Sequence, residues 1–101
     1  MTGKVPGVEH SMAQVARTFL IVNTLGLHAR AAAQLVQTAN RYRAEVHVAK
    51  DGVEVNGKSI MGVLTLAAAK GTTIDVSCNG EDADDAMAAL AAVIENGFGE
   101  R

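Results

Sequence analysis

The sequence predicts a single α+β domain with the element order β-α-β-β-α-β-α. Three short segments alternate apolar with polar residues, as half-buried strands do, and a fourth is rich in residues that favour strands. In three other segments apolar residues recur at helical spacing. Two split β-α-β units imply a sheet with helices packed on one face, and the pattern alone leaves a ferredoxin-like fold open.

The first strand and the first helix are separated by a glycine. The strand is expected at residues 17–23, where β-branched and aromatic side chains concentrate, and Gly26 interrupts it. Helical spacing begins near residue 29 and should end at Asn40. The apolar residues that share one face of this helix are Ala32, Leu35, Val36 and Ala39.

A β-hairpin should follow the first helix. Residues 44–48 alternate apolar with polar side chains, as in a strand with one buried face. The dipeptide Asp51-Gly52 is typical of tight hairpin turns, so residues 53–55 should form the return strand.

The second helix should begin at Ser59, whose hydroxyl can accept from a backbone amide in the first turn, and should end at Gly71. Its apolar residues at helical spacing are Ile60, Val63, Leu64 and Ala67. A fourth strand is expected at residues 73–78, where polar and apolar residues alternate again.

The last helix has the clearest apolar stripe and should end at Asn96-Gly97. The stripe consists of Ala83, Ala86, Met87, Leu90, Ala91 and Ile94. Acidic residues gather at its start and suit the positive end of the helix dipole. These residues are Glu81, Asp82, Asp84 and Asp85.

Composition narrows the class of protein. The chain has 101 residues, a net charge of −2 and only three aromatic side chains, which disfavours binding to nucleic acid or to an anionic membrane. The single cysteine, Cys78, cannot form an internal disulfide and fits a reducing compartment. No apolar run approaches the roughly 20 residues that a transmembrane helix needs. We therefore expect a cytoplasmic protein.

Residues 1–15 are expected to form an unstructured leader or an extended start, ahead of a domain at 16–101. This segment contains the only proline, Pro6, and shows no regular apolar pattern. Met12 would be a plausible alternative first residue.

The junction before the first helix is the most informative segment for function. His28 stands where a helix should begin, with Arg30 two residues later. Unpaired backbone amides and the helix dipole favour an anion at such a position. A phosphorylated imidazole would supply one: it would lie against the amides of Ala29 and Arg30, and the guanidinium could bind its oxygens.

Other interpretations of this histidine remain open from spacing alone. A histidine at a helix start is usually an ordinary surface residue, and short motifs have high false-positive rates. His10 and His47 provide no metal-ligand spacing with His28, so no metal site and no cofactor are expected. No nucleophile elbow supports a Ser-His-Asp triad.

Two motifs change this assessment when they are read together. Residues 26–30 read Gly-Leu-His-Ala-Arg, and residues 56–63 read Asn-Gly-Lys-Ser-Ile-Met-Gly-Val. Both resemble motifs of the HPr family, the histidine phosphocarriers of the bacterial phosphotransferase system. Residues 69–71 and 97–100 also look like family features. The resemblance runs from about Arg17 to the C-terminus, and departs at Ala31, where the family usually has proline.

The resemblance implies an open-faced β-sandwich with a four-stranded antiparallel sheet in the order 1-4-2-3 and three helices on one face. It implies that His28 accepts a phosphoryl group from phospho-enzyme I on Nδ1 and passes it to IIA components of sugar permeases. Such a protein acts stoichiometrically, as a monomeric carrier rather than a true enzyme. Arg30 would stabilise the phosphoryl group.

The resemblance also makes Ser59 a candidate for regulatory phosphorylation by HPr kinase/phosphorylase. Leu27 and Met61 would dock partner proteins, together with some of Ile60, Leu64 and Leu66. Met61 is the best surface candidate because methionine adapts to several partners, whereas Ile60 and Leu64 suit the core better.

Two alternatives belong to other classes of protein. The first is an HPr-like regulatory binding module that is not coupled to sugar transport. The second is an unrelated ferredoxin-like protein that binds a small molecule or RNA, which the negative charge and the scarcity of aromatic residues disfavour.

Overall fold

The computed structural model describes residues 13–100 and confirms the predicted element order. The strands are β1 (Gln14–Leu20), β2 (Glu45–Lys50), β3 (Val53–Asn56) and β4 (Thr73–Asn79). The helices are α2 (Ala29–Ala39), α3 (Ile60–Thr65) and α4 (Ala83–Glu95), and a short 3₁₀ turn, η1 (Gly97–Gly99), follows.

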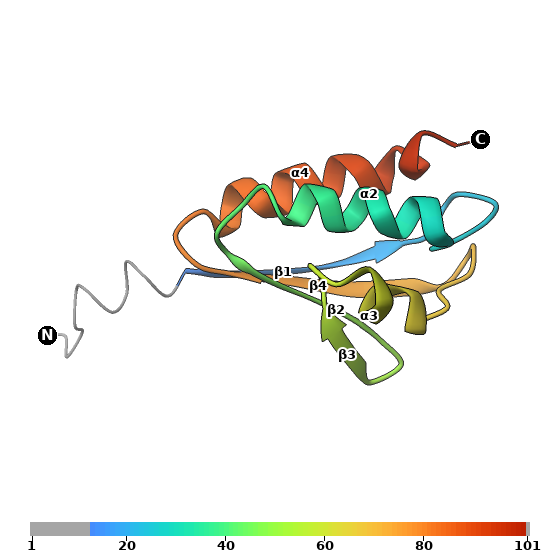
Figure 1. The fold of residues 1–101 in the computed structure, drawn as a ribbon, viewed down its shortest axis with the longest axis horizontal. Helices are drawn as coiled ribbons and strands as arrows, with labels where there is room; N and C mark the ends of the chain where they lie inside the picture. The colour runs from blue at the N-terminus through green and yellow to red at the C-terminus, as the bar shows by residue number, and fades with distance from the viewer. Residues whose placement is uncertain (1–12, 101) are drawn as a thin grey trace, which may run out of the picture.

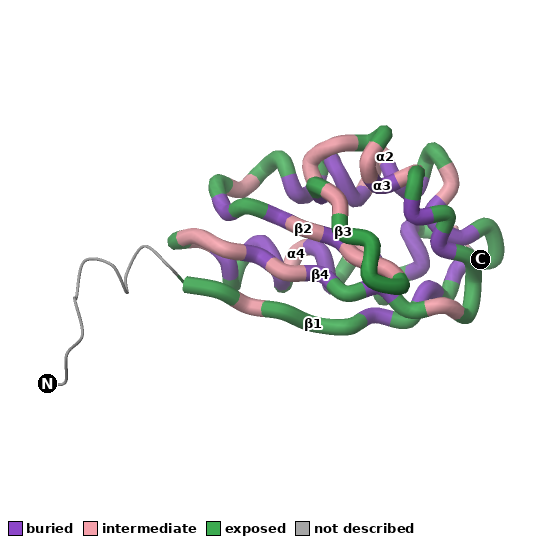
Figure 2. Tube along the Cα trace, turned by 90° about the horizontal axis from the view of Figure 1, so that it is seen from below, coloured by how far each residue is buried: buried purple, intermediate pink, exposed green. Residues whose placement is uncertain are grey.

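The four strands form one antiparallel sheet in the order β1-β4-β2-β3, as the resemblance implied. Figure 1 shows α2 and α4 lying side by side across one face of this sheet, and α3 contacts both α2 and β3. Figure 2 views the sheet from the opposite side, where exposed and half-buried residues lie along the strands between the buried ones. The fold is therefore an open-faced sandwich with a single core.

The core lies between the sheet and the two long helices and is mainly aliphatic. Every residue of the two predicted stripes on α2 and α4 is buried, because each stripe faces the sheet. The inward-facing strand residues alternate with exposed or half-buried neighbours, as the period of a strand requires. Those on the two central strands are Val46, Val48, Ile74, Val76 and Cys78.

The first strand begins earlier than expected. It starts at Gln14 rather than Arg17, because residues 14–20 pair with β4 along their whole length. Gln14 and Val15 therefore belong to the sheet and not to a leader, and the strand ends at Leu20. Of the rest of the predicted leader, Ala13 precedes the strand, and residues 1–12 lie outside the described residues, as does Arg101, the end of the predicted domain.

The second helix is shorter than its apolar stripe predicted. It ends at Thr65 rather than at Gly71, because Ala67 adopts a left-handed backbone with φ of 47° and the chain leaves the helix there. The Ala68 carbonyl then accepts a hydrogen bond from the Leu27 amide at 2.8 Å. The segment after α3 thus supports the loop before α2, and this tertiary contact outweighs the local helical preference.

The start of α4 is tied to the loop before β2 by a carboxylate. Asp82 is the N-cap residue, but its side chain accepts from the backbone amides of Arg43 and Ala44, each at 2.8 Å, instead of capping its own helix. The hydrogen bond from Arg43 contributes most to holding the pKa of Asp82 below its ordinary value; that from Ala44 acts in the same direction, and partial burial opposes them. This contact fixes the return of the chain after α2.

Candidate functional site

The loop between β1 and α2 places His28 at the start of the helix. Gly26 turns this loop with φ of 65°, and a Cβ atom there would collide with the Ala68 carbonyl, so only glycine fits the position. The His28 amide donates to the Gly26 carbonyl at 2.9 Å. His28 itself has an extended backbone and is the N-cap of α2, as predicted.

The imidazole ring turns one nitrogen toward the helix start. Nδ1 of His28 accepts from the backbone amide of Arg30 at 3.3 Å, which is a long hydrogen bond. The first amide that donates into the helix is that of Ala32, to the His28 carbonyl at 2.8 Å. The amides of Ala29 and Arg30 therefore precede the helical ladder. The side chain of His28 is 27% exposed, so the ring remains open to solvent from one side.

The other ring nitrogen contacts a residue that the sequence did not indicate. Nε2 of His28 is hydrogen-bonded to the Glu100 carboxylate, whose second oxygen accepts from Nδ2 of Asn23 at 3.0 Å. The hydrogen bond from Asn23 is the main cause that lowers the pKa of Glu100 below its ordinary value. The contact with His28 and the charge of Arg30 act in the same direction, and partial burial opposes them.

Glu100 reaches the site because the C-terminal turn folds back over α2. Phe98 is buried in the core, and its carbonyl accepts from the side chain of Gln34 on α2 at 3.1 Å. Sequence periodicity carries no signal for this contact, because η1 is too short to show a period. The only available signal was the run at residues 97–100, which looked like a family feature.

Arg30 lies at the second position of α2 and is exposed. Among residues 13–100 no ion pair involves its guanidinium, although its charge is close enough to lower the pKa of Glu100. An exposed guanidinium beside the helix start can bind an incoming anion without first breaking an ion pair.

Ser59 stands at the start of α3, as predicted. Its hydroxyl oxygen accepts from the Gly62 amide at 3.1 Å, and the residue is half-buried. The structure brings the helix of Ser59 into contact with α2, the helix that begins at His28.

The expected docking residues differ in their exposure to solvent. Met61 is 74% exposed, as predicted, whereas Leu27 is only 4% exposed. The interpretation of Leu27 as a docking residue is therefore wrong: its side chain is part of the core, and its amide is bonded to Ala68. Ile60 is exposed rather than in the core, because α3 has six residues and buries only Val63.

Leu64 and Leu66 are less accessible than Met61. Leu64 is half-buried against the core, and Leu66 is buried. Sequence reasoning missed Leu25, an apolar residue that is 68% exposed in the loop before His28. The sequence offered no sign that Leu25 lies outside the core, because the two leucines flanking Gly26 look alike and only one of them is buried.

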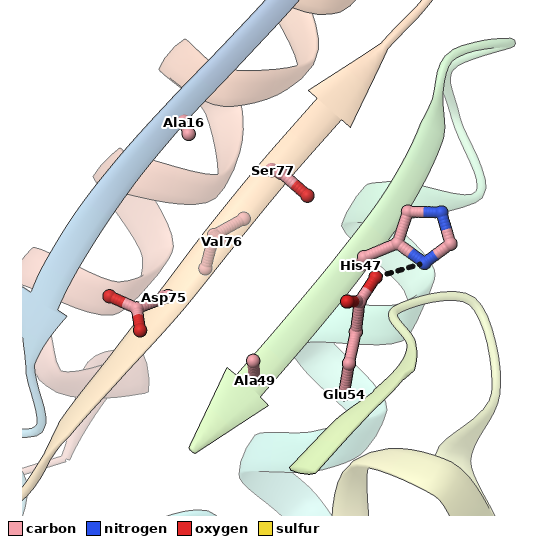
Figure 3. A pocket seen from close by; sticks show the side chains of 7 residues that line it. All are labelled: Ala16, His47, Ala49, Glu54, Asp75, Val76 and Ser77. Atoms are coloured by element: carbon pink, nitrogen blue, oxygen red, sulfur yellow. Dashed lines mark ion pairs between the residues drawn. The ribbon is translucent and has the colours of Figure 1, made fainter. Parts of the chain in front are cut away.

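The remaining polar cluster lies on the open face of the sheet. Figure 3 shows a hollow whose side chains include His47 and Glu54, with Nδ1 of His47 3.1 Å from the Glu54 carboxylate. Across residues 13–100 no group of three or more His, Cys, Asp or Glu side chains could hold a metal ion. Within the same residues, no helix has the length and apolar character needed to cross a membrane.

Comparison with known proteins gives a consistent result. A family model described as "PTS HPr component phosphorylation site" matches residues 15–96. The Phosphocarrier protein HPr of Neisseria meningitidis serogroup A is 52% identical over 80 residues, which cover 79% of this chain and 90% of that protein.

Solved structures of HPr proteins have the same fold. The structure of HPr from Thermoanaerobacter tengcongensis has a TM-score of 0.83 at 42% identity and covers 86% of this chain and 98% of that one. The phosphocarrier protein HPr from Bacillus anthracis has a TM-score of 0.77 at 44% identity and covers 81% of this chain and 98% of that one.

Proposed function

This chain belongs to the HPr family, the phosphocarrier proteins of the phosphotransferase system, and we propose that it carries the phosphoryl group on Nδ1 of His28. One observation carries this proposal: Nδ1 of a partly exposed histidine lies against the amide of Arg30, at the start of a helix. Nucleophile and anion-binding groups therefore meet at the same point.

The helix start would stabilise the phosphoryl group as it arrives. The lone pair of Nδ1 forms the bond to phosphorus while the bond from phosphorus to the donor breaks, and the donor atom keeps that electron pair. The phosphoryl oxygens then lie near the amides of Ala29 and Arg30, which precede the helical ladder. The guanidinium of Arg30 can bind two of these oxygens in a fork.

We propose phospho-enzyme I as the donor and IIA components of sugar permeases as the recipients. A carrier must dock to both of these proteins through one surface around its histidine. Three exposed apolar side chains could form such a surface: Ile60 and Met61 on α3, and Leu25 on the loop before α2. Helices α2 and α3 contact each other. Such side chains suit brief docking to several proteins. The chain is expected to act as a monomer and to be regenerated stoichiometrically.

Labelling with phosphoenolpyruvate and enzyme I tests the proposal. The full chain should take up one phosphoryl group in a linkage that is labile in acid and stable in alkali, as a phosphoramidate is. His28→Ala should take up none, whereas His47→Ala should be labelled like the wild type, because His47 lies on the open face of the sheet. Label on His28→Ala would refute the assignment of the acceptor.

We further propose that Ser59 is a regulatory phosphorylation site for HPr kinase/phosphorylase. The half-buried hydroxyl of Ser59 lies directly before the exposed Ile60 and Met61. The phosphate dianion of a phosphorylated Ser59 would need hydration, and docking of an apolar partner surface would remove that water. This arrangement also supports the alternative in which the chain serves only as a regulatory binding module. Phosphoryl uptake by His28 from enzyme I distinguishes the two functions.

A further inference from the structure

The contact between Glu100 and His28 is built into the structure rather than a chance surface pair. Asn23 is 2% exposed, and its Nδ2 donates one hydrogen to the Gly26 carbonyl at 2.8 Å and the other to Glu100 at 3.0 Å. A buried amide in the loop that carries His28 thus holds the carboxylate in place. The buried Phe98 and its bond to Gln34 fix the backbone of the same tail from the other side.

The carboxylate determines which ring nitrogen carries the proton. An ionised carboxylate can only accept hydrogen bonds, and the hydrogen bond from Asn23 keeps Glu100 ionised by lowering its pKa. Nε2 of His28 must therefore donate to Glu100. Nδ1 of the same neutral ring then has no hydrogen and keeps its lone pair, which agrees with its acceptance of a hydrogen bond from the Arg30 amide.

We propose that Glu100 is a positioning residue for phosphoryl transfer, which holds the proton of His28 on Nε2 and balances the charge of the ring when Nδ1 is phosphorylated. The inference rests on the proposed role of His28 and adds to it a residue in the C-terminal turn. Glu100 acts through the imidazole and does not contact the phosphoryl group.

No proton has to move during the transfer of the phosphoryl group. When the lone pair of Nδ1 forms the bond to phosphorus, the bond between phosphorus and the donor atom of phospho-enzyme I breaks, and that atom keeps the electron pair. The ring retains its hydrogen on Nε2 and becomes a cation, which the carboxylate of Glu100 faces directly. In the onward transfer a nucleophilic atom of the recipient protein forms a new bond to phosphorus while the bond between phosphorus and Nδ1 breaks. The electrons of the broken bond return to Nδ1, and the ring is neutral again.

Glu100→Gln tests the inference because it removes the charge and keeps the shape. The tautomer can be read from the ¹⁵N resonances of the His28 ring in the full chain under alkaline conditions, at about pH 9. The wild type should show an unprotonated Nδ1 and a protonated Nε2. In Glu100→Gln the two resonances should approach each other, as the Nδ1-protonated population rises about fivefold.

Glu95→Gln is the matched control, since Glu95 is exposed at the end of α4 and pairs with Arg17 at 3.1 Å instead of His28. Its His28 resonances should match those of the wild type. If the resonances of Glu100→Gln do so as well, with its amide spectrum showing an intact fold, the inference is overturned. A wild-type ring protonated on Nδ1 would also overturn it.

A second measurement separates this inference from the proposed function. With saturating phospho-enzyme I, Glu100→Gln should be phosphorylated about tenfold more slowly, with little change in the enzyme I concentration needed for half-maximal rate. Equal rates in Glu100→Gln and Glu95→Gln would refute the role in transfer. Absence of label from wild-type His28 would refute the proposed function instead, and the tautomer measurement would still decide what Glu100 does to the ring.

Discussion

Helices α2 and α3 begin in the same way and differ in what surrounds the capping side chain. Nδ1 of His28 accepts from the second amide of α2 at 3.3 Å, and the hydroxyl of Ser59 accepts from the third amide of α3 at 3.1 Å. The serine oxygen is a good N-cap and satisfies an amide that would otherwise be unpaired. Histidine is not a preferred cap, and its hydrogen bond is the longer one.

The two helix starts also differ in their other contacts. His28 is held from its far side by Glu100 and has the exposed Arg30 beside it, so a ring nitrogen and a positive charge lie at the same helix start. Ser59 precedes exposed apolar residues on a helix of only six residues. The ring nitrogen at the start of α2 is therefore oriented from a second direction, whereas the hydroxyl at the start of α3 caps its helix beside exposed apolar side chains.

The largest effect within this comparison should come from Arg30. Arg30→Ala should slow phosphorylation of His28 by phospho-enzyme I by roughly ten- to a hundredfold, the range that a charge-assisted hydrogen bond of about 1.5–3 kcal/mol provides. The midpoint of thermal unfolding should hardly change, because the side chain is exposed. Arg30→Lys keeps the charge but loses the fork, so its rate should lie between those of the wild type and Arg30→Ala. Unchanged kinetics in Arg30→Ala would remove Arg30 from the site.

The same two helix starts show what the sequence could and could not predict. Capping is local, so His28 and Ser59 were placed correctly at the starts of α2 and α3 from nearby residues alone. Glu100 was missed because its position depends on how the C-terminal turn packs against α2. A contact between segments so far apart in the chain leaves no periodic pattern.

The wrong predictions for the end of α3 and for the docking residues have a related cause. The apolar stripe continued past Thr65, but the chain leaves the helix there so that Ala68 can bond to Leu27. The same contact accompanies the burial of Leu27, while the shortness of α3 leaves Ile60 exposed. Periodicity gives the faces of a helix but does not show which of several apolar residues a neighbouring loop will cover.

The second prediction adds charge at the other helix start. Ser59→Asp, a partial mimic of phosphoserine, should weaken binding to enzyme I by about five- to tenfold, which corresponds to roughly 1 kcal/mol. The carboxylate still caps α3 but resists burial against an apolar partner surface at Met61. Titration of enzyme I with the variant measures the affinity. Ser59→Asn is a neutral control of equal size, and equal affinities for the Asp and Asn variants would contradict the inhibitory role.

The third prediction is that Ser59 contributes to the stability of the fold but not to the phosphorylation of His28. Ser59→Ala removes the cap of α3 and should lower the free energy of unfolding by about 1 kcal/mol, while phosphorylation of His28 continues at the wild-type rate. For a domain of this size the midpoint of thermal unfolding should fall by roughly 4–8 °C. Ser59→Thr retains a hydroxyl and should lose less. A Ser59→Ala variant as stable as the wild type would show that the 3.1 Å hydrogen bond contributes nothing.

The smallest effect is expected for Ala31→Pro, which restores the residue that usually follows arginine in the family motif. Ala31 is the third residue of α2, and the helical ladder begins with the amide of Ala32, so proline at position 31 removes no bond of that ladder.

Two effects of Ala31→Pro oppose each other. Restriction of the unfolded chain by proline should stabilise the fold by roughly 0.4–1 kcal/mol. Ala31 is fully buried, so the larger ring must find room in the core, and proline also disfavours a helical backbone at Arg30. We expect the free energy of unfolding to change by no more than about 1 kcal/mol and the rate of phosphorylation by enzyme I to stay close to that of the wild type. Thermal unfolding and labelling measure the two quantities. A loss of several kcal/mol would mean that the first turn of α2 does not have the geometry that accepts proline in the family, and that Ala31 is here a packing requirement of the core rather than a neutral replacement.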